Sequence, residues 1–250
     1  MIILKSSQEI EKIRKACIVV ADVLERIRDL VRPGTSTQSL DDAAERWIRE
    51  AGALPAFKGY RGYPRTLCTS VNNEVIHGIP SRDVVLKTGD IVSIDVGAIS
   101  EGFYGDAAVT LPVGEISSAA ARLIKATEES LLRGIEQARE GNRLYDISHA
   151  VQRHIEAQGY SIVRDYVGHG IGRNLHEDPQ IPNFGSSGQG PRLKAGMVLA
   201  IEPMVNAGGS ATVAKQDGWT VVTADGSLSA HFEHTIAIMN NGPEILTKKQ

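Results

Sequence analysis

Acidic and histidine residues set into apolar, glycine-flanked segments are the part of this sequence that could do chemistry. Asp95 and Asp106 each interrupt a run of strand-forming residues, where a buried strand normally carries an apolar side chain. A carboxylate in such surroundings is destabilised by the loss of its water unless a cation compensates its charge. Two solvated aspartates in turns are the alternative interpretation, because glycines lie close to both.

A second copy of the pattern favours the first interpretation. Residues 86–95, Leu-Lys-Thr-Gly-Asp-Ile-Val-Ser-Ile-Asp, match residues 193–202, Leu-Lys-Ala-Gly-Met-Val-Leu-Ala-Ile-Glu, position by position. A turn before an apolar run is common by itself, but here one histidine and two acids recur in the same order, which favours an internal duplication. The corresponding pairs are Asp95 with Glu202, Asp106 with Glu233, and His77 with His169. We therefore predict one domain, 1–250, with pseudo-repeats at about 6–112 and 117–245.

Gathered in one place, these side chains would form a site for divalent metals. The candidate ligands are Asp95, Asp106, His169, Glu202 and Glu233, with His77 and His176 beside them. Carboxylates in an apolar interior in this number need about two divalent cations to neutralise them. Oxygen-rich ligation with histidine suits manganese, iron(II), cobalt or zinc. Two such ions, roughly 3.5–4 Å apart, activate a shared water and polarise a carbonyl, so the residues predict a dinuclear hydrolase.

The length, composition and charge of the chain limit the class of protein. It has 250 residues, 42% of them hydrophobic, and a formal net charge of −3, which is typical of a globular protein and does not favour a nucleic-acid surface. No apolar run reaches the roughly 20 residues that span a bilayer, and the first residues do not form a signal peptide. Cys17 and Cys68 are too far apart in sequence to indicate a disulfide framework. We expect a cytoplasmic protein that does not bind membranes.

Helices and strands that could position the site follow from the periodicity. Ser6 and Glu9 form a capping box, and apolar residues at steps of three and four predict a helix from there to Val31. Further helices are predicted at 37–50, 117–139 and 145–158. Residues 91–106 read as a hairpin, and 229–238 alternate as one strand, with His231 and Glu233 on the same face. The predicted class is α+β.

Taken together, the motifs closely resemble those of the type I methionine aminopeptidases in their short bacterial form. The resemblance covers nearly the whole chain. It is carried by Cys68, His77-Gly78-Ile79-Pro80, Asp95-Val96-Gly97, Gly105-Asp106, Gly168-His169-Gly170-Ile171-Gly172, His176-Glu177, Ile201-Glu202-Pro203 and Phe232-Glu233-His234-Thr235. It implies the pita-bread fold, with two pseudo-symmetric halves around a central antiparallel sheet, in agreement with the duplication.

The resemblance also implies a role for each site residue. Asp95, Asp106, His169, Glu202 and Glu233 would bind two divalent ions (cobalt, manganese, iron(II) or zinc), with Asp106 and Glu233 bridging. Glu202 would help to deprotonate the attacking water, while His176 would stabilise the oxyanion and His77 would orient the scissile amide. The methionine pocket would be lined by Tyr60, Tyr63, Cys68 and Trp219. Phe57 and Leu175 depart from a familiar bacterial pattern and are expected to alter only the shape of the pocket.

The implied substrates are unblocked N-terminal methionine peptides and nascent chains with a small second residue, and the ribosome is a candidate partner. A monomer is the default expectation.

Two other interpretations stay open. A prolidase or aminopeptidase P shares fold and ligands, although the Tyr60, Tyr63 and Cys68 loop and the short chain count against it. A non-catalytic pita-bread binding module is disfavoured because all the ligand-type residues are present, and metal content would distinguish it.

Overall fold

The computed structural model of the chain describes residues 1–248, which form four α-helices and fifteen strands. The helices are α1 (Ser7–Arg28), α2 (Thr37–Glu50), α3 (Ser118–Gln137) and α4 (Leu144–Ala157), and a short 3-10 helix covers Tyr60–Gly62. The strands of the first half are β1 (Leu54–Pro55), β2 (Leu67–Val71), β3 (Glu74–Ile76), β4 (Ile91–Ser100) and β5 (Phe103–Pro112). Those of the second half are β6 (Ser161–Ile162), β7 (Gly168–Gly170), β8 (Glu177–Ile181), β9 (Val198–Ile201), β10 (Met204–Asn206), β11 (Thr212–Ala214), β12 (Val221–Thr223), β13 (Ser229–His231), β14 (Glu233–Met239) and β15 (Gly242–Ile245).

The main sheet is antiparallel and joins strands from both halves of the chain. Nine strands form it, in the order β1-β4-β5-β14-β9-β7-β8, with β2 beside β4 and β15 beside β14. At its centre β5 pairs with β14, so that Glu233 lies opposite Ala108. On either side, β4 carries Asp95 and β9 ends just before Glu202. The α+β class predicted from the sequence is confirmed, and the two copies of the acidic pattern meet across the central strand pair.

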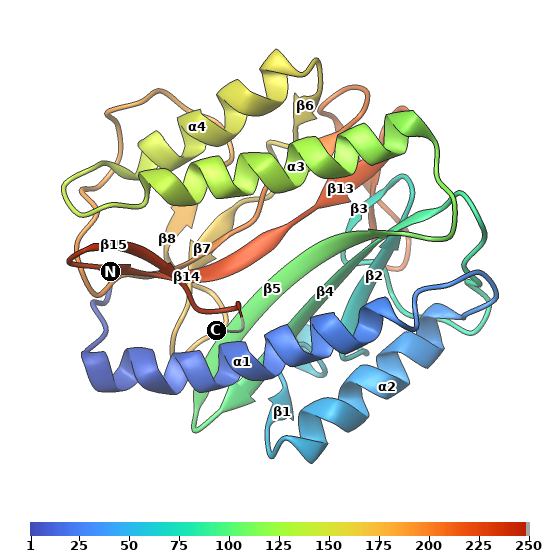
Figure 1. Cartoon of the computed structure of the whole chain (residues 1–250), viewed down its shortest axis with the longest axis horizontal. Coiled ribbons are helices and arrows are strands. Elements are labelled where there is room, and N and C mark those ends of the chain that lie inside the picture. The colour runs from blue at the N-terminus through green and yellow to red at the C-terminus, as the bar shows by residue number, and fades with distance from the viewer. Residues whose placement is uncertain (249–250) are drawn as a thin grey trace.

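Helices pack along the sheet in two pairs. In Figure 1, α1 and α2 occupy the lower part of the view and α3 and α4 the upper part, with β4, β5 and β14 running between them. Helix α1 packs on β4 and β5, and α3 packs on α4 and on strands of the second half. The largest cluster of buried apolar side chains joins α1, α2, α3 and α4 to the inner strands, which gives the strands a rigid support. Among the described residues, no helix is both long and apolar enough to cross a membrane.

The first helix begins as predicted but ends early. The hydroxyl of Ser6 accepts a hydrogen bond from the backbone N–H of Glu9, and the Glu9 carboxylate accepts one from the Ser6 N–H. The helix ends at Arg28, where the N–H groups of the next residues fold back onto the Ile27 carbonyl. Val31 is nevertheless buried in the main core, so its apolar pattern reflects burial and not helical conformation.

Gly105 explains how α1 lies so close to the site. A Cβ atom at this position would lie 2.6 Å from the backbone nitrogen of Cys17 in α1. The missing side chain lets the helix backbone rest directly on β5, next to Asp106.

The hairpin predicted at 91–106 is longer in the structure. Strands β4 and β5 stay paired from Ile91 opposite Pro112 to Ser100 opposite Phe103.

The prediction of one continuous strand over 229–238 is wrong. The chain breaks at Phe232 into β13, which pairs with β10, and β14, which pairs with β5 and β9. Phe232 donates its N–H to the Pro203 carbonyl at the crossing point. An alternating pattern does not reveal such a change of sheet, because each part keeps the period of two.

Candidate metal centre

Every residue predicted to act in the site lines a single cavity of about 190 Å³. The lining residues are Phe57, Tyr60, Arg61, Tyr63, Cys68, His77, Asp95, Asp106, His169, Leu175, His176, Glu202, Trp219 and Glu233. They divide into two regions. We call Asp95, Asp106, His169, Glu202 and Glu233 the carboxylate floor, and Phe57, Tyr60, Tyr63, Cys68, Leu175 and Trp219 the apolar wall.

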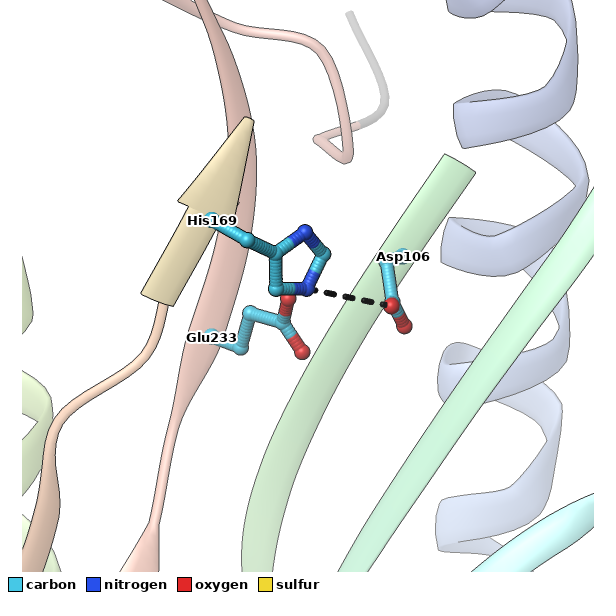
Figure 2. Close-up of side chains that lie close together, drawn as sticks. All are labelled: Asp106, His169 and Glu233. Carbon is cyan, nitrogen blue, oxygen red and sulfur yellow. Dashed lines mark ion pairs between the residues drawn. The ribbon is translucent and has the colours of Figure 1, made fainter. Parts of the chain in front are cut away.

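The floor is built on neighbouring strands of the main sheet. Asp106 on β5, His169 on β7 and Glu233 on β14 offer ligand atoms that all lie within 4.8 Å of one another, and all three residues are buried. Figure 2 shows His169 and Glu233 pointing from their strands toward Asp106. The His169 Nε2 atom lies 4.0 Å from Asp106 Oδ2 and 3.5 Å from Glu202 Oε1. These side chains lie close enough together to bind a divalent cation.

Unsatisfied oxygens show that the floor fits a metal. Among the described residues, Asp95 Oδ1, Asp106 Oδ1 and Glu233 Oε1 are buried and lack a hydrogen-bond partner. Burial raises the pKa of Asp95 to about 7 and that of Glu202 to about 8. Burial, followed by the neighbouring carboxylates, also raises the pKa of Asp106 and of Glu233 well above the usual range. Bound cations would reverse this effect by stabilising the ionised forms.

The His169 ring is held in the state that can bind a metal. Its Nδ1–H donates to the Gly170 carbonyl over 2.9 Å, which leaves the Nε2 lone pair directed at the carboxylates. Burial, and then the adjacent His176, lower the pKa of His169 to about 3. The imidazole is therefore neutral, and its contacts with Asp106 and Glu202 are not ion pairs in this state.

Two further histidines flank the floor. The His176 ring lies 4.4 Å from the His169 ring, centroid to centroid, and its Nδ1 is 2.8 Å from the hydroxyl of Tyr60. His77 stands edge-on to Trp219 and Tyr166, with centroids 6.3 and 6.1 Å away. Burial, followed by the charges of His231 and His176, lowers the pKa of His77 to about 4. Unlike its counterpart His169, His77 thus lies among aromatic rings.

The wall is supplied by loops and by β2. Tyr63 and Trp219 meet edge to face at 5.1 Å. The Tyr63 hydroxyl donates to the carbonyls of Leu67 and Gly78, which fixes its ring. Cys68, Phe57 and Leu175 are buried beside it. The result is an apolar, polarizable surface next to the floor.

Three residues at the site were not assigned a role from the sequence. His231 Nε2 lies 3.6 Å from Glu202 Oε2, and alternation with Glu233 was the signal that could have identified it. Arg61 lines the cavity from the loop between the two tyrosines. Thr235 Oγ1 accepts from the Asp106 N–H and donates to the Asp106 carbonyl, so it ties β5 to β14 beside a floor carboxylate.

Known proteins match nearly the whole chain. The model of a family described as metallopeptidase family M24 matches residues 11–240. A methionine aminopeptidase of Clostridium acetobutylicum is 55% identical over 247 residues, which cover 99% of each chain.

Solved structures extend the comparison to the fold. A methionine aminopeptidase of Thermotoga maritima superposes with a TM-score of 0.98 at 51% identity, over the full length of both chains. A prolidase of Pyrococcus furiosus superposes with a TM-score of 0.79 at 25% identity, covering 99% of this chain and 66% of that one. The pita-bread fold expected from the sequence is confirmed.

Proposed function

The chain belongs to metallopeptidase family M24, and from this premise we infer that it removes the N-terminal methionine from peptides and proteins. The observation that carries the inference is a full-length identity above 50% to methionine aminopeptidases, together with a cavity lined by all the site residues. The prolidase is matched at much lower identity and over only part of its length. We therefore favour methionine over proline specificity.

The carboxylate floor would hold two divalent ions, which would be manganese, iron(II), cobalt or zinc. Asp95, Asp106, His169, Glu202 and Glu233 would be the ligands, with Asp106 and Glu233 bridging. The unpartnered buried oxygens and the raised carboxyl pKa values support this proposal. When bound, such ions lower the pKa of a shared water and polarise the scissile carbonyl.

The protein's own groups would position the reactants and move protons. Glu202, which faces His169 and His231, would accept the proton of the attacking water. His176, exposed at the rim of the site, would donate a hydrogen bond to the oxyanion. His77 would orient the scissile amide and assist proton transfer to the departing amine.

The apolar wall would bind the methionine side chain. Tyr60, Tyr63, Cys68 and Trp219 present aromatic and sulfur surfaces, which suit an unbranched thioether. The resemblance also implies that the second residue of the substrate has a small side chain. We also propose that the enzyme acts in the cytoplasm as a monomer, on free peptides and on nascent chains, with the ribosome as a candidate partner and no nucleic-acid surface of its own.

Release of methionine from Met-Gly-Met-Met tests the function. The purified protein would be freed of metal and assayed with each of the four metals in turn, beside Leu-Gly-Met-Met, an Xaa-Pro peptide and N-acetylated Met-Gly-Met-Met. Metal-dependent release from the unblocked methionine peptide alone is expected, and Asp106→Ala should abolish it. Cleavage of the Xaa-Pro peptide would move the protein to the prolidase branch, and no turnover with any metal would leave a binding module.

A further inference from the structure

A buried ion pair joins the N-terminal segment to the loop that carries His176. Lys5 Nζ lies 2.5 Å from Glu177 Oε2, and the two side chains are only 4% and 6% exposed. By comparison, the ion pair of Lys15 with Glu101 is far more exposed, at 51% and 45%. A buried pair is costly to form and strongly fixed once formed, because separating the charges would leave one unpaired in the interior.

Lys5 is held by its backbone as well as by its charged group. Its backbone N–H donates to the Gly196 carbonyl over 2.7 Å, and its ammonium group also donates to the Ile3 carbonyl. Nearby, the N-terminal ammonium of Met1 forms an ion pair with the carboxylate of Asp178. These contacts hold the segment 1–5 in place beside the loop that carries His176.

Glu177 transmits this constraint to the loop. Its second oxygen, Oε1, accepts a hydrogen bond from the backbone N–H of Asn174 over 3.1 Å. Gly172 in turn donates its N–H to the Asn174 carbonyl and accepts from the Tyr104 N–H. The Glu177 side chain thus ties the backbone before His176 to the residue that follows it.

Gly172 makes the contact possible. A Cβ atom there would lie 2.4 Å from Lys5 Cε and 3.0 Å from Glu177 Oε1. The lysine stem therefore passes directly over the loop backbone, and any larger residue would displace it.

His176 lies next to Glu177 in this supported segment. The residue is exposed, and its ring is located by the Tyr60 hydroxyl on one side and by the His169 ring on the other. We propose that Lys5 is a positioning residue that acts through Glu177 to place the His176 imidazole for the reaction. This inference rests on the proposed function, since it assigns a purpose to that placement.

A double-mutant cycle tests the proposal. Lys5→Met keeps the stem but removes the charge, and it should lower kcat for Met-Gly-Met-Met about 10- to 100-fold, the loss expected from a misplacement of up to about 1 Å, with KM unchanged. In the His176→Ala background the same change should have no further effect. Lys15→Met, which breaks an exposed pair, is the matched control and should leave kcat unchanged.

A purely structural role would lower kcat by the same factor in both backgrounds, and that result, or an unchanged kcat, would overturn the proposal. Should Lys5→Met not fold, Lys5→Met combined with Glu177→Gln removes both charges and replaces it in the cycle. Absence of turnover by the unmodified chain would instead count against the proposed function. Positioning is then judged from the NMR resonances of the His176 ring, which should shift in Lys5→Met and not in Lys15→Met; no shift would refute it.

Discussion

The carboxylate floor and the apolar wall share one cavity but are built in different ways. Four of the five floor side chains project from strands whose register is fixed by backbone hydrogen bonds, as where Glu233 lies opposite Ala108, and Glu202 directly follows β9. Most of the wall comes from loops, and its members meet through ring contacts such as that of Tyr63 with Trp219. Register allows little freedom, whereas apolar contact tolerates several shapes. On the proposed function, the chemistry would therefore depend on the sheet and the selectivity on the loops.

The sharpest test of this difference is Glu202→Gln in the floor. The amide keeps the shape of the side chain but cannot accept a proton, so kcat should fall by about 10²- to 10⁴-fold. Metal content, measured by elemental analysis, should show that both ions are retained. Glu101→Gln at an exposed position is the control. Full turnover with both metals bound would remove Glu202 from the role of base.

A somewhat smaller loss is expected for His176→Ala, at the boundary between the two regions. Removing one hydrogen-bond donor to an oxyanion costs about 10²- to 10³-fold in kcat, with little change in KM. Steady-state kinetics of peptide cleavage provide the measurement, and the exposed His149→Ala is the matched control. A rise in KM alone would place His176 in binding instead of catalysis.

In the wall, Trp219→Ala should affect binding more than turnover. The indole stacks edge-on with Tyr63 and His77, and such contacts are worth about 0.5–1.5 kcal/mol each. KM for Met-Gly-Met-Met should rise about tenfold while kcat changes little, and the preference for methionine over leucine should narrow. A loss of kcat comparable to that of Glu202→Gln would mean that wall and floor are not separable.

The smallest effect is a pH dependence of stability that the buried carboxyls of the floor should cause. Burial raises the pKa of Asp95 to about 7 and of Glu202 to about 8, so the folded metal-free protein binds more protons than the unfolded chain at neutral pH. Its free energy of unfolding should therefore fall as pH rises from about 7 to 8, a range above the pKa of unfolded histidine and below those of unfolded thiols and phenols. Thermal melts with and without Mn²⁺ give the comparison, and about 2–4 °C corresponds to 1 kcal/mol in a chain of this size. An equal slope with saturating metal would contradict the assignment.

The sequence predicted the residues of the carboxylate floor better than the strand pairing and the long-range contacts around them. Asp95 and Glu202 stood out because an acid within an apolar strand needs a partner, and the duplication placed them in register. By contrast, periodicity did not reveal that the chain changes sheets at Phe232, since this depends on pairing with β10. Nor did it reveal the ion pair of Lys5 with Glu177. The two residues are 172 positions apart in sequence, and a lysine near an N-terminus gives no sign by itself that it is buried.

The central pairing of β5 with β14 also has an evolutionary consequence. Each half contributes two of the floor carboxylates, so on the duplication predicted from the sequence a half-length ancestor could complete this site only by associating with a second copy of itself. On that duplication, joining the copies in one chain would have freed them to diverge. His169 lies among carboxylates and His77 among aromatic rings, so the two histidines would mark where the symmetry of such a dimer was lost.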